Sequence, residues 1–304
     1  MLQEFRDQDR AALFRFRGRL WPEGDYHRSP AYREWNVGAN PHGGPQAWLA
    51  MEDGEAKAEC QGLPAVLVRD GKALAASWCI ELYAEPGARR RGLGSALVGR
   101  WMAEAGVPLV MGPSADSRPI FLKAGCKPLG ALDSWVASTG LLARLRRPGA
   151  PRLEARPVPA FDPGWDPVWE EARRGLVHLR RDHAWLDWRF TRQPEVRYES
   201  LVFLRGGSPC GYAALRPMGE RCRMADLAAL PEALPGVLAL CLGRARGMGA
   251  RVLQFPVFAP SLEEALSRSG FRREGEWRPL LAGPGGEGGS WFVISADADQ
   301  EHPG

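Results

Sequence analysis

Residues 81–100 read ELYAEPGARRRGLGSALVGR, and this stretch decides the fold. The mostly apolar run over 80–84 is typical of a strand, and it is followed by Pro86, which cannot donate to a strand ladder. Three arginines and the turn Gly92-Leu93-Gly94 come next, and the residues after them carry apolar side chains at helical spacing. The stretch therefore predicts a strand, a glycine-rich turn and the start of a helix.

A helix that begins in a glycine turn can bind an anion, because its first N–H groups point outward and the helix dipole favours negative charge. Gly92 and Gly94 allow close approach of the backbone, and Arg89–Arg91 can add charge-assisted hydrogen bonds to phosphate oxygens. The alternative is a solvated arginine loop before an amphipathic helix. The stretch lacks G-x-x-x-x-G-K-[ST], and Leu97 stands where a dinucleotide fold needs a third small residue, so neither of those phosphate sites is predicted.

The order of strand, Pro86, Arg89-x-x-Gly92-x-Gly94 and helix resembles the acyl-CoA pyrophosphate loop of the GNAT superfamily of N-acyltransferases, which is written [QR]-x-x-G-x-[GA]. The segment ELYAEP is similar to that family's fourth strand, and LKAGCKPLG at 122–130 is similar to its Y-x-K-x-G-F segment. The resemblance covers residues 1–145 and implies that the anion is the pyrophosphate of coenzyme A.

The resemblance also implies which residues contact the co-substrate, acetyl-CoA or another acyl-CoA. Backbone groups of Leu82, Tyr83 and Ala84 would bind pantetheine, and an N–H near them would polarise the thioester carbonyl. Ser114 occupies the position of a family asparagine that often contacts pantetheine, and Phe121 replaces the tyrosine that usually acts as the general acid. The pyrophosphate would be held by Arg89, Arg90, Arg91, Gly92, Leu93, Gly94 and Ser95.

Acyl transfer to an amine needs a group that removes the amine's proton, because only the neutral amine attacks. Glu81 occupies the acidic position of the motif and is our candidate; its alternative role is a surface or ion-paired carboxylate. Tyr83 shares a face of the strand with Glu81. Three roles are open for it: it lines the acceptor site, it replaces the usual tyrosine as the acid, or it only fills the face of the sheet. Phe121 cannot donate a proton, so either water or another hydroxyl helps the thiolate to leave, or catalysis is weakened or lost.

The chain repeats itself, which predicts a duplication. AYREWNVGANP at 31–41 matches AWLDWRFTRQP at 184–194, and LKAGCKPLG at 122–130 matches SRSGFRREG at 267–275. The recurrence of Trp35 as Trp188 favours a structural role for these rings. Stacking on a sugar or a flat ring is the alternative for the tryptophan-rich segment at 165–188.

We therefore predict an α/β (α+β) protein with two GNAT-like domains in tandem, each a mixed, mostly antiparallel sheet flanked by helices. Residues 1–147 would form the N-terminal domain with the acyl-CoA site, the proline-rich residues 148–163 a linker, and residues 164–304 the C-terminal domain. The second half has no R-x-x-G-x-G where the loop should recur. The resemblance thus implies a domain that has lost its cofactor loop and serves as a lid, a substrate wall or a docking partner.

Hydrophobic periodicity and turn residues predict the elements of the first half. Asp70-Gly71 is a strong hairpin signal. We predict helices over 4–20, 94–105 and 117–124, and strands over 65–68, 73–78, 80–84, 107–111 and 133–138.

Composition narrows the class of protein. The chain is 45% hydrophobic and 25% charged, begins without an apolar leader and has no apolar run long enough to cross a bilayer, so we expect a cytoplasmic protein with no membrane partner. Its six cysteines lack C-x-x-C spacing, which predicts free buried thiols and no metal site. The net charge of +4 is small, and the basic runs at 89–91 and 144–147 have no interleaved aromatics, so nucleic-acid binding is a disfavoured alternative.

Together these features predict an N-acetyltransferase that moves an acyl group, acetyl being our expectation, from acyl-CoA to a primary amine by direct attack in a ternary complex, without a metal. The acceptor is a small-molecule or protein amine, and Glu81 favours a cationic one. The alternative, based on Phe121 and the degenerate second half, is an acyl-CoA-binding sensor or pseudoenzyme of the same fold. The sequence does not set the acceptor's identity, the acyl chain length or the oligomeric state.

Overall fold

The structure of the protein, a computed structural model, describes residues 1–44, 46–140 and 153–298. The first half contains β1 (Leu2–Glu4), η1 (Asp7–Asp9), α1 (Arg10–Leu20), η2 (Tyr26–Arg28), α2 (Pro30–Arg33), the π-helix η3 (Glu34–Gly38), β2 (Gln46–Glu52), β3 (Glu55–Arg69), β4 (Lys72–Ala84), η4 (Pro86–Ala88), α3 (Leu93–Glu104), β5 (Val107–Met111), α4 (Arg118–Lys123) and β6 (Lys127–Ser138). The second half contains β7 (Glu154–Pro157), η6 (Pro163–Trp165), α5 (Asp166–Ala172), β8 (Val177–Leu179), α6 (His183–Leu186), the π-helix η7 (Asp187–Thr191), β9 (Glu199–Arg205), β10 (Ser208–Met218), β11 (Arg221–Ala229), α7 (Leu234–Gly247), β12 (Val252–Phe258), η8 (Pro260–Leu262), α8 (Glu263–Arg268), β13 (Arg272–Ala282), β14 (Trp291–Ile294) and η9 (Ser295–Asp297).

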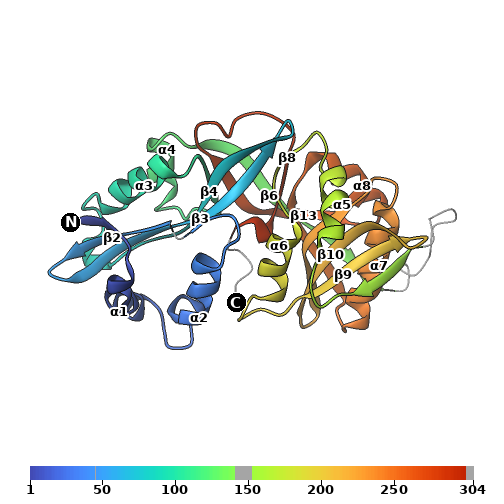
Figure 1. Ribbon diagram of the computed structural model, residues 1–304, viewed down its shortest axis with the longest axis horizontal. Coiled ribbons are helices and arrows are strands. Elements are labelled where there is room, and N and C mark those ends of the chain that lie inside the picture. Colours follow the sequence, from blue (N-terminus) through green and yellow to red (C-terminus); the bar gives the residue numbers. More distant parts are fainter. Residues whose placement is uncertain (45, 141–152, 299–304) are drawn as a thin grey trace.

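One sheet runs through both halves in the order β1-β2-β3-β4-β5-β13-β6-β12-β11-β10-β9-β7. Along this order the neighbours within each half are antiparallel except for one parallel pair, β4 with β5 and β11 with β12. Off this path, β8 and β14 form a further parallel pair. In the first half, α1 and α2 cover one face of the sheet and α3 and α4 the other (Figure 1). The predicted class, a mixed and mostly antiparallel sheet flanked by helices, is confirmed.

The two halves are joined at the centre of the sheet, where each half inserts one strand into the other half's part of the sheet. In the first half β6 follows β5 through α4, yet it pairs with β12 and β13. In the second half β13 follows β12 through α8, yet it pairs with β5 and β6. The exchange is therefore the same in both directions, as expected for two like halves facing each other.

A reciprocal pair of tryptophans lies where the repeated segments meet. The Trp35 indole N–H donates to the carbonyl of Trp188 at 2.8 Å, and the Trp188 indole N–H donates to the carbonyl of Trp35 at 2.8 Å. The rings stack with centroids 5.1 Å apart and planes 19° apart. Each tryptophan belongs to a π-helix that follows a one-turn α-helix, η3 after α2 and η7 after α6. The structural role predicted for this pair is confirmed.

Both halves also share a β-bulge. In β4, Glu81 is opposite Gln61 but Cys79 is opposite Gly62, so Ile80 is the extra residue. In β11, Asp226 is opposite Ala214 but Met224 is opposite Leu215, so Ala225 is the extra residue. A bulge bends its strand and changes the direction of the following side chains. It also makes Asp226 the positional counterpart of Glu81.

Most of the predicted elements occur, with different bounds. The strand over 107–111 is confirmed as β5, and the Asp70-Gly71 hairpin is confirmed, with φ of 49° and 71° at its two residues. The helix predicted over 4–20 is wrong at its start, because β1 and η1 precede α1. The strands predicted over 73–78 and 80–84 form one strand, β4, because the bulge at Ile80 bends the strand without ending it.

The expected linker is described only in part. Its first residues, 148–152, lie outside the described residues, and so does the whole basic run at 144–147. Residues 154–157 form β7, which pairs antiparallel with β9. That part of the expected linker therefore belongs to the sheet, because its extended backbone pairs with β9 at the edge of the sheet. The domain bounds otherwise stay a prediction.

Buried side chains in the described residues include all six cysteines, whose thiols are free, as predicted. The tryptophans at 165, 169, 185 and 188 are also buried, so packing rather than ligand stacking accounts for them. Within the described ranges, every helix is too short or too polar to span a membrane.

Candidate active site

The central feature of the candidate site is that β4 extends beyond the part of it that pairs with β5. The parallel register runs from Ala76 opposite Val107 to Cys79 opposite Val110. The bulge at Ile80 follows directly, and β4 continues to Ala84. The backbone of Leu82, Tyr83 and Ala84, predicted to contact pantetheine, therefore lies on the stretch that has separated from β5.

The predicted anion loop lies at the end of this strand. Gly92 has a φ of 80°, in the left-handed region that favours glycine, and α3 begins at the next residue. A Cβ at Gly94 would come 3.2 Å from the Ile120 side chain, so this position favours glycine because of contact with α4. Gly92 and Ser95 are exposed and Leu93 is half-buried. The helix start is thus accessible, with the conformation that the glycine pattern predicts.

The three loop arginines have different surroundings. Arg91 forms an ion pair with Glu52 of β2, with Nη1 donating to Oε2 at 3.0 Å. Arg89 donates from Nε to the carbonyl of Ala84 at 3.4 Å. Arg90 is exposed and has a φ of 61°. Two of the arginines therefore fasten the loop to β2 and β4, in addition to any role toward an anion.

Ser114 and Phe121 have clear local roles before and within α4. The Ser114 hydroxyl accepts from the N–H of Ser117 at 3.1 Å and stabilises the turn that leads into the helix. The Phe121 ring is 2% exposed and meets Trp101 edge to face at 6.1 Å. It belongs to the apolar core under α3 rather than to an open surface. Contacts of either residue with a cofactor stay predictions.

Glu81 is buried among polar groups on the face of the sheet that α1 covers. The side chain is 4% exposed, so its alternative role as a surface carboxylate is wrong. Glu81 and Tyr83 share this face with Glu59 and Gln61 of β3, because β3 and β4 place Glu59 opposite Tyr83 and Gln61 opposite Glu81. The His27 Nε2 lies 3.7 Å from the Glu81 Oε2.

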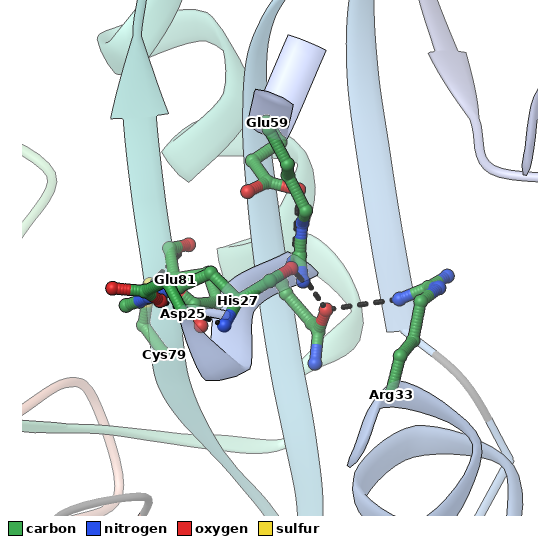
Figure 2. Close-up of polar contacts among 8 residues, drawn as sticks. Asp25, His27, Arg33, Glu59, Cys79 and Glu81 are labelled. Carbon is green, nitrogen blue, oxygen red and sulfur yellow. Dashed lines mark hydrogen bonds and ion pairs between the residues drawn. The ribbon is translucent and has the colours of Figure 1, made fainter. Parts of the chain in front are cut away.

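Two buried arginines hold the β3 side of this polar face. Arg17 of α1 pairs with Glu59 at 3.1 Å and donates to the backbone carbonyl of His27 at 2.8 Å. Arg33 of α2 donates to Gln61 at 3.0 Å. Burial, with the nearby charge of Arg17, lowers the pKa of Arg33 to about 10. Figure 2 shows these contacts extending from Arg33 to Glu59, beside Asp25, His27 and Glu81.

Tyr83 keeps its proton in this environment. Burial raises the pKa of its hydroxyl well above the ordinary value, and the carboxylates of Glu81 and Glu59 raise it further. The ring meets Trp21 edge to face at 4.6 Å. A protonated, half-buried hydroxyl beside Glu81 can donate a hydrogen bond, which agrees with a role at the acceptor side of the sheet.

Sequence reasoning missed His27 and Asp25. The His27 Nδ1 lies 2.6 Å from the Asp25 Oδ1, and the ring stacks on Trp21 at 4.2 Å. The residues lie in the connection between α1 and α2, where the D-Y-H spacing carries no motif. Only the fold brings this connection against β4.

Comparisons with known proteins bear on the fold. No protein-family model matches the chain, and no curated protein matches its sequence. Three solved structures, each 15% identical to the chain, resemble it closely. They are a probable N-acyltransferase from Enterococcus faecalis V583 (TM-score 0.70, 93% of this chain and 72% of that one), a GCN5-related N-acetyltransferase from Anabaena variabilis (0.65, 92% and 72%) and one from Kribbella flavida (0.63, 93% and 70%).

The chain has the fold of the GCN5-related N-acetyltransferases. The resemblance inferred from the sequence is thereby confirmed at the level of the fold. It covers nearly the whole chain, including the second half, where the sequence motifs were weaker.

In the second half, Asp226 occupies the position that corresponds to Glu81 and is closed off from solvent. Asp226 is fully buried and pairs with Arg181, whose Nε lies 2.9 Å from its Oδ2; Arg181 also pairs with Asp297. Burial raises the pKa of Asp226 and of Asp297, although Arg181 opposes the shift. Ala233, the residue before α7, has a φ of −91°, whereas Gly92 before α3 has 80°. The carboxylate at this position is therefore paired with an internal arginine.

No three His, Cys, Asp or Glu side chains within residues 1–44, 46–140 and 153–298 are grouped so that they could hold a metal ion.

Proposed function

We propose that the protein transfers an acyl group, acetyl in the simplest case, from acyl-CoA to a primary amine, and that every contact with the acyl-CoA is made by the first half of the intact chain. One observation carries the proposal: β4 separates from β5 after Cys79, and its free end leads through η4 to a left-handed glycine, Gly92, that precedes α3. Pantetheine would lie against the backbone of residues 82–84, and the pyrophosphate at the amides of residues 92–95. The N-acyltransferase names of solved structures with this fold support the same reaction class.

The chemistry follows from the groups on either side of β4. A backbone N–H of residues 82–84 polarises the thioester carbonyl, and Glu81 takes a proton from the amine on the α1 side of the sheet. The amine nitrogen bonds to the carbonyl carbon and the carbon–sulfur bond breaks. The CoA thiol has a pKa of about 8.5, so its thiolate is a tolerable leaving group and can take a proton from water without the usual tyrosine.

The proposal extends to the acceptor and the cell compartment. The buried carboxylate of Glu81 favours a cationic amine, on a small molecule or a protein. Six buried thiols suit the reducing cytoplasm, where we place the protein. The proposal includes no nucleic-acid or membrane partner.

A screen of amines with acetyl-CoA, monitored by release of the CoA thiol, tests the reaction, and calorimetry with acetyl-CoA tests the site. We expect thiol release with a subset of cationic amines and one binding site per chain. Two sites, or binding that survives loss of the loop, would contradict the placement in the first half.

Phe121 favours a second candidate, an acyl-CoA sensor, because the core ring offers no proton. The same pair of measurements separates the two: a sensor binds acetyl-CoA at one site and releases no thiol with any amine.

A further inference from the structure

His27 is a buried imidazole placed between two carboxylates. Its side chain is 8% exposed, its Nδ1 lies 2.6 Å from Asp25 Oδ1, and its Nε2 lies 3.7 Å from Glu81 Oε2. The ring therefore lies between buried Glu81 and Asp25, whose side chain is 24% exposed, and Figure 2 shows the three residues close together.

The ring is held firmly in this orientation. The backbone N–H of His27 donates to Asp25 Oδ1 at 2.9 Å, which caps η2. Trp21 stacks on one side of the ring at 4.2 Å, and Tyr26 lies against it at 3.9 Å. Arg17 binds the His27 carbonyl at 2.8 Å. Rotation of the imidazole away from the two carboxylates would break this packing.

Charged and titratable groups lie on several sides of the ring. The charged and titratable groups that face it from its own connection, α1, β3 and β4 are Asp25, Tyr26, Arg17, Glu59, Glu81 and Tyr83. Arg17 is paired with Glu59, so its charge is largely compensated. The neutral ring can donate from Nδ1 to Asp25 and present Nε2 to Glu81, while the protonated ring has a carboxylate on each side.

The proposed reaction needs a path for protons. A cationic amine and a thioester give an amide, a free thiol and one proton, because an ammonium group enters and a neutral amide leaves. That proton arises at Glu81, which is 4% exposed. Glu81 must return to its carboxylate form before the next turnover, so the proton must move from a buried group to solvent.

We propose that His27 and Asp25 relay this proton from Glu81 to solvent. The inference rests on the proposed function. The amine N–H proton moves to the Glu81 carboxylate, and the Glu81 hydroxyl then protonates His27 Nε2. The imidazolium releases its Nδ1 proton through Asp25 to water, which leaves Glu81 and Asp25 as carboxylates and His27 as the Nε2–H tautomer. After the products leave, uptake of a proton from water at Nδ1 and loss of the Nε2 proton to water restore the starting tautomer. The 3.7 Å between Nε2 and Oε2 exceeds a hydrogen bond, and catalytic contacts of this kind commonly tighten when the substrates bind.

The first test reads the coupling without turnover, by ¹⁵N NMR of histidine-labelled protein over pH. We expect His27 to be an Nδ1–H tautomer when neutral, and its titration midpoint to fall by about one pH unit in Glu81→Gln and in Asp25→Asn, since each loses one flanking charge. His42, a buried imidazole 3.8 Å from Asp182, is the internal reference and should not move. If the titration midpoint of His27 is the same in Glu81→Gln as in the native protein, the relay is overturned.

The second test is kinetic. His27→Ala should lower kcat about 10²-fold with the KM for acetyl-CoA unchanged, and free imidazole should restore part of the rate in proportion to its concentration. His42→Ala is the matched control; we expect nearly full activity and no response to imidazole. A purely structural role for His27 predicts a lower melting temperature without rescue, and that result, or full activity of His27→Ala at every pH, overturns the relay. If the native protein releases no thiol with any amine, the proposed function is overturned instead. The NMR test does not depend on turnover and still measures the coupling between His27 and Glu81 in that case.

Discussion

At the scale of single residues, the chemistry depends on where Glu81 lies. A surface carboxylate would be solvated and would need no partner. Glu81 is buried beside Tyr83, which stays protonated, and 3.7 Å from an imidazole. Such a carboxylate can exchange protons with defined neighbours, and the substitution of this one side chain tests its role.

We expect Glu81→Gln to lower kcat/KM by about 10²–10⁴ and to leave the affinity for acetyl-CoA nearly unchanged. Glutamine keeps the size of the side chain but cannot accept the amine's proton. The loss should shrink as pH rises, because more of the free amine is then already neutral. Initial rates of thiol release over pH check this, with the exposed Glu104→Gln on α3 as the control. Full activity of Glu81→Gln at every pH would assign the base to another residue.

Glu81 and His27 show which residues of the candidate site can be predicted from the sequence and which cannot. Glu81 was predictable because it lies inside a continuous motif whose spacing fixes the strand, the turn and the helix together. His27 was not, because it acts with a residue on another element and no local spacing records the contact. The same holds for Arg17, which pairs with Glu59 across the interface between α1 and β3.

At the scale of elements, the start of α3 and its counterpart α7 differ in backbone conformation. The first follows a left-handed glycine and contacts α4 at Gly94; the second follows Ala233 in a right-handed conformation. The bulges in β4 and β11 are alike. The sequence revealed the missing loop in the second half, because glycines are visible in it. It did not reveal the shared bulge, because a bulge is a property of the pairing between two strands.

Gly92→Val and Gly94→Val should each weaken acetyl-CoA binding more than Arg90→Ala does. Valine is strained at the positive φ of Gly92, and its side chain meets Ile120 at Gly94. Each lost N–H bond to a charged oxygen costs about 1.5–3 kcal/mol, roughly ten- to a hundredfold in affinity. Calorimetry measures the three affinities. Gly99→Val, in α3 with nothing within 4 Å of a Cβ, is the control. Equal losses in all three variants would mean that the arginine, and not the turn, carries the binding.

Arg181→Leu should destabilise the fold by about 3–5 kcal/mol at neutral pH, because it leaves Asp226 and Asp297 buried without their cation. Burial already raises both carboxyl pKa values above those of the unfolded chain. Their contribution to stability is therefore largest below the unfolded pKa and is lost as pH rises through the folded one. The deficit of the variant should accordingly shrink as pH falls toward 4. Denaturant unfolding at several pH values measures it, and a deficit independent of pH would contradict this account.

At the scale of the whole molecule, the central strands decide how the halves depend on each other. β13 lies between β5 and β6, and β6 lies between β13 and β12, so each half holds a strand that completes the other. β8 adds a second connection by pairing with β3, and the Trp35–Trp188 pair adds a third. The sequence predicted β5 and part of β6, because period and turn signals are local, but it predicted neither β12 nor β13. It could not assign their partners, since the sequence pattern of β6 would be the same whether it paired with strands of the first half or of the second.

We therefore expect the two halves to unfold together, although they are separate segments of the sequence. Calorimetry should show one transition, and its midpoint should rise with acetyl-CoA although the ligand contacts only the first half, because a ligand stabilises whatever unit must fold to bind it. Residues 1–147 alone should bind acetyl-CoA weakly or not at all, since β5 and β6 lose the strand between them. Adding residues 148–304 as a separate chain should restore binding if the exchange can re-form. Two separate transitions, of which acetyl-CoA shifts only one, would show that the halves are independent units and that the exchanged strands contribute little to the binding site.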